Sequence, residues 1–418
     1  MAFAAISAGA PVRVLQGSRG LEDLASLVLD LKRKPRPSAL DAQKRWEESL
    51  AALLADDAKR LEESLESWPE LLVQSDSTGN SLLHRAASAG ALQATALLLE
   101  RGASANLRNQ EEATAGDLAF RAGKQAVFEA LVLHRVFCIR REEEEAPQEP
   151  PRKRRAPDPA APDPYHSQRL RYEGSRLLDA DSKAVMMGWE APLMKKHAEV
   201  LLPVRGLRVA NVGFGLGLVD GFLAELGPSE HHIIESHGDV LAELRRCGWP
   251  SRPGVAVHEG RWQEIVPQLE SGSLDAIFFD TWSETYEDLR QFQDEVSRLL
   301  APGGRFSFFN GMAPYSIAEH AAFCRLAQED LETLGLPCDI CKIELGELGD
   351  QTWHGVAERY WQFDSYYLPL ARKAPSRDSE HPMSWRRWPQ FPVCVTDKLG
   401  KALPLAEFGL SDMTSGRP

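Results

Sequence analysis

The chain reads Arg208-Val209-Ala210-Asn211-Val212-Gly213-Phe214-Gly215-Leu216-Gly217, and this stretch decides the fold. Four mostly apolar residues run directly into three alternating glycines, which predicts a buried strand followed by a tight turn. Glycine has no Cβ and accepts positive φ, so such a turn lets the backbone approach a ligand closely. A tight turn that binds nothing is the alternative interpretation.

The spacing of the glycines favours one kind of ligand. A dinucleotide fingerprint needs its third glycine one place later, where this chain has Leu218. The G-x-G-x-G spacing favours the methionine–adenosine moiety of S-adenosylmethionine over a pyrophosphate. Glu235 ends the next apolar run, roughly 20 residues on, where a carboxylate can accept hydrogen bonds from ribose hydroxyls.

From about residue 165 the chain alternates strand and helix patterns, which predicts an α/β fold with a parallel, doubly wound sheet. In such a sheet the ligand lies at the carboxyl ends of the strands. The expected strands are Arg208–Val212, His232–Glu235, Val255–His258, Ala276–Asp280 and Arg305–Asn310, with two later ones near Ile340–Leu345 and Tyr360–Tyr367.

Further candidates follow the expected strands. Trp262 and Gln263 come after the third strand, where the indole can flank an adenine; packing in a surface helix is its other interpretation. Asp280 follows three apolar residues at the end of the fourth strand, which is typical of a functional carboxylate. Glu190 lies upstream in a Met-rich segment, where it can also simply favour a helix N-terminus.

The N-terminal part divides into a poorly patterned segment (residues 1–40) and a repeat region (41–138). Ser81-Leu82-Leu83-His84-Arg85-Ala86 resembles the T-P-L-H-x-A pattern of ankyrin repeats, and a degenerate copy begins at Thr114 after a period of about 33 residues. We expect an all-α ankyrin-like domain, with a partial repeat near residues 45–75 as its cap. His84 is expected to form structural hydrogen bonds in its turn.

Residues 139–164 read as a linker, because acidic, basic and Pro-rich runs follow one another and cannot form a core. Its basic tetrad, Arg152 to Arg155, fits either a nuclear localisation signal or a solvated charge cluster. The α/β part with the glycine turn is then assigned to residues 165–418.

Composition limits the functional classes. The net charge of −13 argues against a nucleic-acid-binding body, and no apolar run is long enough to cross a membrane. The N-terminus lacks the charged start of a secretory signal, although a transit peptide remains open. Six scattered cysteines suit a reducing compartment, and Cys338 and Cys341 are interpreted as ordinary buried thiols despite their C-x-x-C spacing.

Six motifs occur in order: V-M-x-x-W-E-x-P-x-M from Val185, N-V-G-F-G-L-G from Asn211, H-H-x-I-E-x-H from His231, H-E-G-R-W-Q from His258, F-D-T-W from Phe279, and P-G-G-R-F-S-F-F-N-G from Pro302. Together they resemble the guanidino methyltransferases. That group includes guanidinoacetate methyltransferase and the ankyrin-bearing protein arginine methyltransferases that act on the δ nitrogen (type IV). The resemblance covers roughly residues 165–370, and the ankyrin-like region favours the protein arginine methyltransferases.

The resemblance implies a class I S-adenosylmethionine-dependent methyltransferase and a set of site residues. Glu190 and Asp280 match the two carboxylates that hold and activate the substrate guanidinium. Cofactor contacts are implied for Tyr172, Met186, Phe214, Gly215, Leu216, Gly217, Leu218, Val219, Glu235, Ser236, His237, Trp262, Gln263 and Asp280. No metal is implied. Ala191 and Ser236 depart from the family's common Thr and Ala, and neither departure removes a charge.

The expected activity is methyl transfer to the δ nitrogen of arginine in a protein that the ankyrin-like region docks. We expect a monomer in cytoplasm and nucleus that binds neither nucleic acid nor membrane. Two alternatives stay open: a small-molecule guanidino methyltransferase, and an inactive ankyrin adaptor with a methyltransferase-like body.

Overall fold

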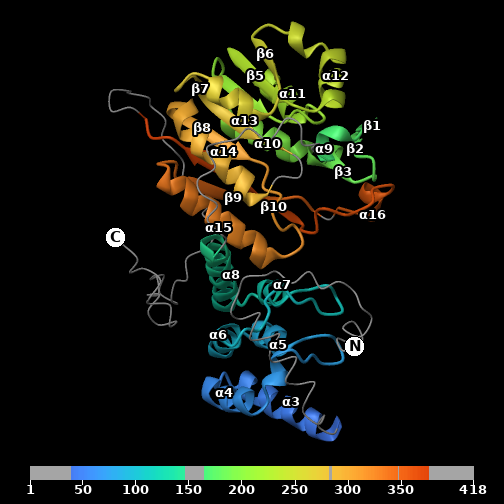
Figure 1. The fold of residues 1–418 in the computed structure, drawn as a ribbon, viewed down its shortest axis with the longest axis vertical. Helices are drawn as coiled ribbons and strands as arrows, with labels where there is room; N and C mark the ends of the chain where they lie inside the picture. The colour runs from blue at the N-terminus through green and yellow to red at the C-terminus, as the bar shows by residue number, and fades with distance from the viewer. Residues whose placement is uncertain (1–38, 146–163, 282–284, 347, 376–418) are drawn as a thin grey trace. The chain divides into compact units, whose positions relative to one another are not determined.

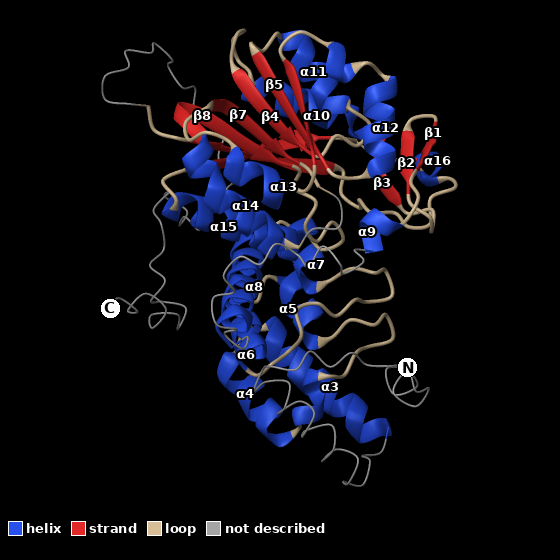
Figure 2. Cartoon of the chain, turned by 45° about the horizontal axis from the view of Figure 1, so that its top comes forward, coloured by secondary structure: helices blue, strands red, loops and turns tan. Residues whose placement is uncertain are grey.

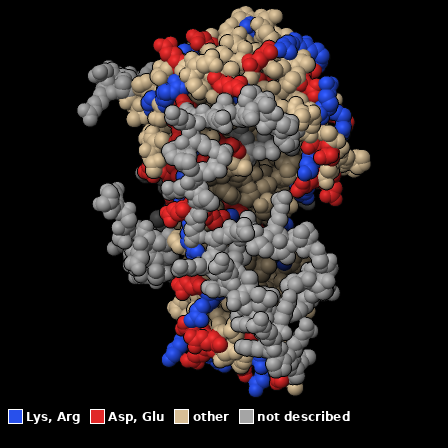
Figure 3. Space-filling model, in the orientation of Figure 1, with Lys and Arg blue, Asp and Glu red and all other residues tan. Residues whose placement is uncertain are grey.

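A computed structural model describes residues 39–145, 164–281, 285–346 and 348–375 of the chain (Figure 1). These residues form two compact units, one within 39–145 and one within 164–375. On the face drawn in Figure 3, acidic and basic side chains of the described residues are interspersed. No helix among the described residues is long and apolar enough to span a bilayer.

The first unit consists of helices joined by turns. They are α3 (Ala39–Leu54), α4 (Ala58–Ser67), the 3-10 helix η1 (Pro69–Leu72), α5 (Leu82–Ala89), α6 (Leu92–Glu100), α7 (Ala115–Arg121) and α8 (Gln125–Glu145). The helices α5 and α7 begin 33 residues apart, and each begins with a capping box on Ser81 or Thr114. The spacing of these two helices therefore follows the period of about 33 residues expected from the sequence.

His84 links one helical pair to the next. Its Nδ1 lies 2.8 Å from the Ser81 hydroxyl oxygen, and its Nε2 lies 3.1 Å from the carbonyl oxygen of Ala113. Burial lowers the pKa of His84, which favours the neutral ring. The structural role expected for this histidine is confirmed.

The helix α8 extends further than the sequence indicated. It runs to Glu145, through the acidic stretch that we had assigned to the linker. Glu142 pairs with Arg135 at 3.3 Å and Glu143 with Arg140 at 3.4 Å, so the acidic side chains have cationic partners on their own helix. The basic tetrad Arg152 to Arg155 lies outside the described residues.

The second unit contains a seven-stranded sheet with the order β6-β5-β4-β7-β8-β10-β9 (Figure 2). Its strands are β4 (Arg208–Val212), β5 (Glu230–Glu235), β6 (Val255–Glu259), β7 (Leu274–Phe279), β8 (Leu300–Phe308), β9 (Cys338–Glu344) and β10 (Ser365–Arg372). The strands from β6 to β8 pair in parallel, and the order reverses between β4 and β7. The sheet has the doubly wound arrangement expected of a class I methyltransferase.

Two details of the expected sheet were wrong. The strand β10 pairs antiparallel with both β8 and β9, so the sheet is mixed and not purely parallel. The last strand also begins at Ser365 and not near Tyr360. The loop residues Arg359 and Tyr360 precede it, because the aromatic run there packs against the second unit's core instead of joining the sheet.

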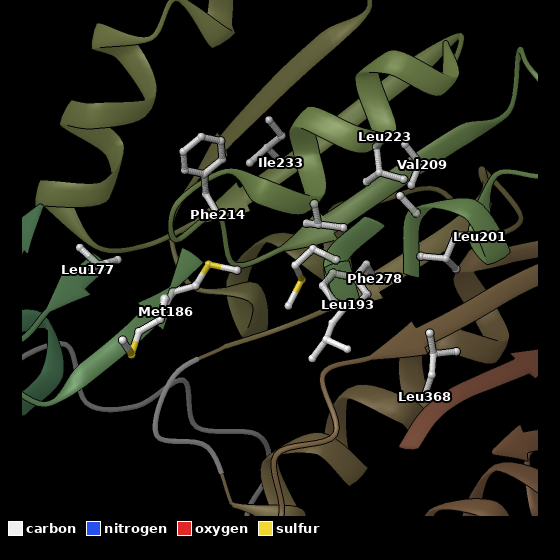
Figure 4. Packing of buried hydrophobic residues seen from close by; sticks show 14 of the residues in the cluster. Leu177, Met186, Leu193, Leu201, Val209, Phe214, Leu223, Ile233, Phe278 and Leu368 are labelled. Carbon is white, nitrogen blue, oxygen red and sulfur yellow. The ribbon is translucent and has the colours of Figure 1, made fainter. Parts of the chain in front are cut away.

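Helices cover both faces of this sheet. Figures 1 and 2 show α10 (Ala191–Leu201), α11 (Leu218–Leu226) and α12 (Gly238–Arg246) on one face and α13 (Trp262–Ile265), α14 (Tyr286–Leu299) and α15 (Ile317–Thr333) on the other. Figure 4 shows how Leu193, Val209, Leu223 and Phe278 interdigitate between the sheet and the first helical layer. This dense core fixes the positions of the strand ends.

A three-stranded antiparallel meander precedes the main sheet and was not expected from the sequence. It comprises β1 (Arg171–Glu173), β2 (Arg176–Leu178) and β3 (Ala184–Met187), and the short helix α9 (Pro164–Ser167) comes before it. The strand β3 leads through the 3-10 helix η2 (Gly188–Glu190) directly into α10. The meander thereby carries Met186 and Glu190 to the methyltransferase-like sheet.

Candidate active site

A cavity of about 810 Å³ opens at the carboxyl ends of β4, β5 and β7, where the strand order reverses. Ligands of doubly wound sheets bind at this place. Nine of the predicted site residues line its wall: Met186, Glu190, Phe214, Gly215, Glu235, Ser236, Trp262, Gln263 and Asp280. The structure therefore brings together residues that are up to 94 positions apart in the sequence.

The glycine turn forms the floor of the cavity. Gly213, Gly215 and Gly217 all have positive φ, at 94°, 53° and 68°. A Cβ on Gly215 would lie 2.7 Å from the sulfur of Met186, and one on Gly217 would meet the ring of Phe214 at 2.5 Å. The turn therefore needs glycine both for its backbone conformation and for the space above it.

Glu235 holds this turn in place. Its Oε2 accepts a hydrogen bond from the Phe214 amide at 2.9 Å, and its Oε1 accepts the amides of Ser236 and His237 at 2.7 Å each. A carboxylate offers about four acceptor positions, so one position on Oε2 remains for a ligand hydroxyl. Glu235 therefore both shapes the turn and lines the cavity. The sequence had indicated only a contact with the ligand and not the hydrogen bonds to the turn.

Glu190 lies on the wall after β3 and is only 3 % exposed. Burial raises the pKa of its carboxyl to about 7, and hydrogen bonds from the Tyr360 hydroxyl and the Met187 amide lower it. Both donors contact the same oxygen, Oε1, at 2.6 Å and 2.7 Å. Among the described residues, no cation forms a salt bridge with this carboxylate.

Asp280 follows β7 and lies on the same wall. Its amide donates to the carbonyl oxygen of Val212 at 2.9 Å, which ties the end of β7 to the end of β4. Burial raises the pKa of the Tyr360 hydroxyl, and the negative charges of Glu190 and Asp280 raise it further. The charges of both carboxylates therefore influence the same hydroxyl, although the two residues are far apart in the sequence, as expected of groups that share a pocket.

Aromatic side chains close the part of the cavity next to Glu190. Tyr360 and Trp361 line the wall, and the ring of Tyr360 packs against Trp353 at 5.1 Å and Trp189 at 5.7 Å between centroids. The sequence pattern had placed Tyr360 at the start of a strand and not in the site, because a single tyrosine carries no spacing signal. Its pairing with a glutamate 170 residues away depends on the tertiary fold.

Trp262 packs in the core and also lines the cavity, and its contact with an adenine stays a prediction. Its indole is 7 % exposed and meets the rings of Phe279 and Phe292 edge-on, at 6.0 Å and 5.2 Å. It also lines the cavity next to Gln263. The packing against the core fixes the orientation of the indole beside the ligand space.

Six predicted cofactor contacts do not line the cavity, and their direct contact with the ligand stays a prediction. They are Tyr172, Leu216, Gly217, Leu218, Val219 and His237. The Tyr172 hydroxyl donates to the carbonyl oxygen of Gly215 at 3.0 Å, and His237 accepts from the amide of Asp239 at the start of α12. Val219 is buried in the core behind the turn. Tyr172, His237 and Val219 therefore lie behind the residues that form the wall.

The wall contains further residues that the sequence analysis did not select. His166 lies 2.7 Å from the Ser236 hydroxyl through its Nε2 and 3.4 Å from the Arg261 guanidinium through its Nδ1. The neighbouring Tyr165 also lines the cavity. This group comes from α9, whose four residues are too few to show a helical pattern in the sequence.

The arrangement fits a nucleoside with a positively charged group. The glycines let the protein backbone approach a ligand closely, and Glu235 retains one acceptor position. The apolar side chains of Met186, Phe214 and Trp262 line the cavity around the turn. Among the described residues no cluster of His, Cys, Asp or Glu could hold a metal. Cys338 and Cys341 are free thiols three positions apart on β9, so they point to opposite faces of the sheet.

Comparisons with known proteins show which proteins this chain is similar to. The family model described as guanidinoacetate N-methyltransferase matches residues 167–319. A protein of Aspergillus oryzae named protein arginine N-methyltransferase 2 is 46 % identical over 211 residues, covering 50 % of this chain and 51 % of the relative. A protein of the same name from Cryptococcus neoformans is 33 % identical over 355 residues, covering 77 % of this chain and 91 % of the relative.

Coverage differs between these relatives. The chain matches about half the length of the Aspergillus proteins, but nearly the whole length of the Cryptococcus protein. Among solved structures, spermidine synthase from Thermotoga maritima aligns with a TM-score of 0.37 and 16 % identity, covering 58 % of this chain and 87 % of the other. An S-adenosylmethionine-dependent methyltransferase from Mesorhizobium loti aligns with a TM-score of 0.32 and 19 % identity, covering 44 % and 98 %.

Proposed function

Because the chain belongs to the protein arginine N-methyltransferase 2 family, we propose that it transfers the methyl group of S-adenosylmethionine to the δ nitrogen of arginine in a protein. The observation that carries the proposal is the pair of carboxylates, Glu190 and Asp280, on the wall of the cavity that the glycine turn forms. The name of the relatives supplies the substrate class, and the geometry supports the chemistry.

S-adenosylmethionine, when bound, supplies a methyl group on a positively charged sulfur. We assign its methionine and adenosine parts to the glycine turn, to Glu235 for a ribose hydroxyl, and to Trp262 with Gln263 for the base. Glu235 has one acceptor position left after three backbone hydrogen bonds, which suits a hydroxyl donor.

The carboxylates suit the other reactant. A guanidinium stays charged at any physiological pH and presents a planar set of donors that carboxylates bind well. Its nitrogen lone pairs are delocalised, so it needs orientation and charge stabilisation before it can act as a nucleophile. We assign the main orienting role to Glu190 and the role of proton acceptor to Asp280.

The proposed methyl transfer is a single displacement. The δ nitrogen forms a bond to the methyl carbon while the bond from that carbon to sulfur breaks, and the electron pair remains on the departing sulfur. The proton of the δ nitrogen passes to the Asp280 carboxylate. Alignment and preorganised charge supply most of the rate in such a reaction.

Methyl labelling tests the proposal directly. The purified full-length chain is incubated with radioactive S-adenosylmethionine and a protein extract, and the acceptor protein is hydrolysed to amino acids. We expect δ-N-methylarginine and no arginine methylated at a terminal nitrogen. Label in terminal-nitrogen derivatives, or no label in protein, contradicts the proposal.

Two alternatives give other outcomes in the same experiment. A small-molecule guanidino methyltransferase, which the match to the guanidinoacetate N-methyltransferase model keeps open, transfers label to free guanidinoacetate and not to protein. An inactive adaptor transfers no label to either acceptor. The buried, hydrogen-bonded Glu190 favours an enzyme, because burying a carboxylate costs free energy that an adaptor has no reason to retain.

We further propose that the first unit is an ankyrin-repeat domain that docks the protein substrate. The 33-residue offset of α5 and α7, their capping boxes and the His84 hydrogen bonds support this assignment. A shortened chain that begins near residue 160 should bind S-adenosylmethionine normally and methylate its protein target poorly. Equal methylation by the shortened and full-length chains contradicts the docking role.

A further inference from the structure

The Glu190 carboxylate presents its two oxygens unequally. Oε1 accepts two hydrogen bonds, from the Tyr360 hydroxyl at 2.6 Å and from the Met187 amide at 2.7 Å. A carboxylate oxygen has two acceptor positions, so these donors fill Oε1. Among the described residues no donor contacts Oε2. The acceptor positions that remain for a ligand are therefore those of Oε2.

We propose that Tyr360 is a positioning residue, which occupies one oxygen of Glu190 and leaves the other oxygen to a single nitrogen of the substrate guanidinium. The proposal rests on the proposed function, since it assigns Glu190 to the guanidinium. It implies that Glu190 holds the substrate through one oxygen, and that Asp280 must complete the orientation of the guanidinium plane.

The need for such a donor follows from the surroundings of Glu190. Among the described residues, the titratable groups that interact with Glu190 are the Tyr360 and Tyr366 hydroxyls. Lys183 and Arg261 also line the cavity, but neither forms a salt bridge with Glu190. Burial raises the pKa of Glu190 to about 7, and the hydrogen bond from Tyr360 is the largest influence that lowers it. Without this hydroxyl, a larger fraction of Glu190 would be protonated at neutral pH and would not attract a guanidinium.

The packing of Tyr360 suits a residue that holds its neighbour in place. Its ring packs against the indoles of Trp353 and Trp189, at 5.1 Å and 5.7 Å between centroids, and the two indoles also contact each other at 6.0 Å. These contacts restrict the rotamer and aim the hydroxyl at Glu190. They also survive replacement by phenylalanine, so Tyr360→Phe removes the hydrogen bond and little of the packing.

The test compares Tyr360→Phe with a matched variant, Tyr286→Phe, in the full-length chain. Tyr286 is also buried and also donates to a carboxylate, Asp330, at 2.7 Å, but it does not line the cavity. We expect Tyr360→Phe to lower kcat/KM for the arginine substrate by about 10-fold to 100-fold, as for the loss of a hydrogen bond to a charged group. The affinity for S-adenosylmethionine should not change.

The pH profile separates a positioning role from a merely structural one. Activity requires ionised Glu190 and is lost as pH falls through its pKa, so removing a donor that lowers this pKa moves the acidic limb to higher pH. We expect a shift of about one pH unit in Tyr360→Phe and none in Tyr286→Phe. A fluorinated tyrosine at position 360, which is a stronger donor of the same shape, should move the limb to lower pH.

A measurement without turnover completes the test. Infrared difference spectra of the substrate-free protein report the carboxyl band that Glu190→Gln abolishes. This band should titrate at higher pH in Tyr360→Phe than in the natural chain. Identical titrations and identical pH profiles overturn the proposal. If the natural chain methylates no arginine, the proposed function fails instead, while the infrared titration still decides whether Tyr360 controls Glu190.

Discussion

The main-chain oxygen of Asp280 lies 1.9 Å from the position that a Cβ atom on Gly213 would occupy. This distance is far shorter than any contact between non-bonded atoms, so the turn after β4 and the end of β7 fit together only when residue 213 is glycine. The amide of Asp280 also donates to the carbonyl oxygen of Val212 at 2.9 Å. The two segments that carry the cofactor turn and the candidate proton acceptor are thus fixed to each other.

The glycines of this turn should respond differently to substitution. Gly213→Ala places a Cβ against backbone at a φ of 94°, so we expect a loss of stability of at least about 1–2 kcal/mol together with loss of S-adenosylmethionine binding. The φ of 53° at Gly215 strains valine as well, but the added side chain meets only the flexible side chain of Met186, so Gly215→Val should still fold and fail to bind the cofactor. Thermal unfolding and calorimetry measure the two effects. Normal affinity in a folded Gly215→Val protein would refute the cofactor assignment.

Glu235 should be sensitive even to a substitution that keeps its shape. Three backbone amides donate to its two oxygens, so the amide group of glutamine must oppose at least one of them. We expect Glu235→Gln to cost about 1–3 kcal/mol of stability and to weaken cofactor binding. The matched control is Glu259→Gln, because Glu259 is the parallel partner of Glu235 on β6 and forms a surface pair with Arg245. Equal effects of both substitutions would contradict the role of Glu235 in the turn.

The sequence predicted those parts of the fold that depend on local pattern. Buried strands and the glycine turn were visible because apolar runs and glycine spacing are properties of neighbouring residues, and the acid Glu235 was found because it ends such a run. Asp280 was found for the same reason. The cofactor turn and the two strand ends that flank it could therefore be located before the structure was known.

The parts that were missed depend on contacts between distant segments. The strands β1 to β3 have at most four residues each, too few to show an alternating pattern. The direction of β10 depends on the connection from β9 and not on its own residues. Tyr360 lies in a loop, and its role appears only when the fold brings it to Glu190. The helical continuation to Glu145 was missed because an acidic run resembles a linker in composition.

Glu190 should make the stability of the cofactor-free protein depend on pH. Burial raises the pKa of this carboxyl from 4.5 to about 7, so the folded chain binds the proton more tightly than the unfolded chain. The resulting stabilisation is complete below about pH 4.5 and is lost as pH rises through about 7, with a total on the order of 3 kcal/mol. Glu190→Gln cannot ionise and should lack this loss, so it should be more stable than the natural chain at about pH 8.

Urea unfolding of both proteins at several pH values measures this difference. The Glu190→Gln variant should also be nearly inactive, since an amide does not attract a guanidinium. Glu259→Gln, on the surface, should keep the pH dependence of the natural chain. If the free energy of unfolding depends on pH in the same way for the natural chain and for Glu190→Gln, the pKa of Glu190 is not raised and the prediction is wrong.

Asp280 should affect the chemical step more than binding. Asp280→Asn keeps the shape of the side chain and removes the charge that accepts the proton of the δ nitrogen, so we expect kcat to fall by roughly 10²-fold or more. The affinity for S-adenosylmethionine should change little, because the backbone contacts between Asp280 and the glycine turn remain. Asp288→Asn is the matched control: Asp288 also lines the cavity, and asparagine can replace it in the capping box of α14. Single-turnover kinetics and analysis of the methylated arginine check both variants. Full activity in Asp280→Asn, or a product methylated at a terminal nitrogen, would refute the proposed mechanism.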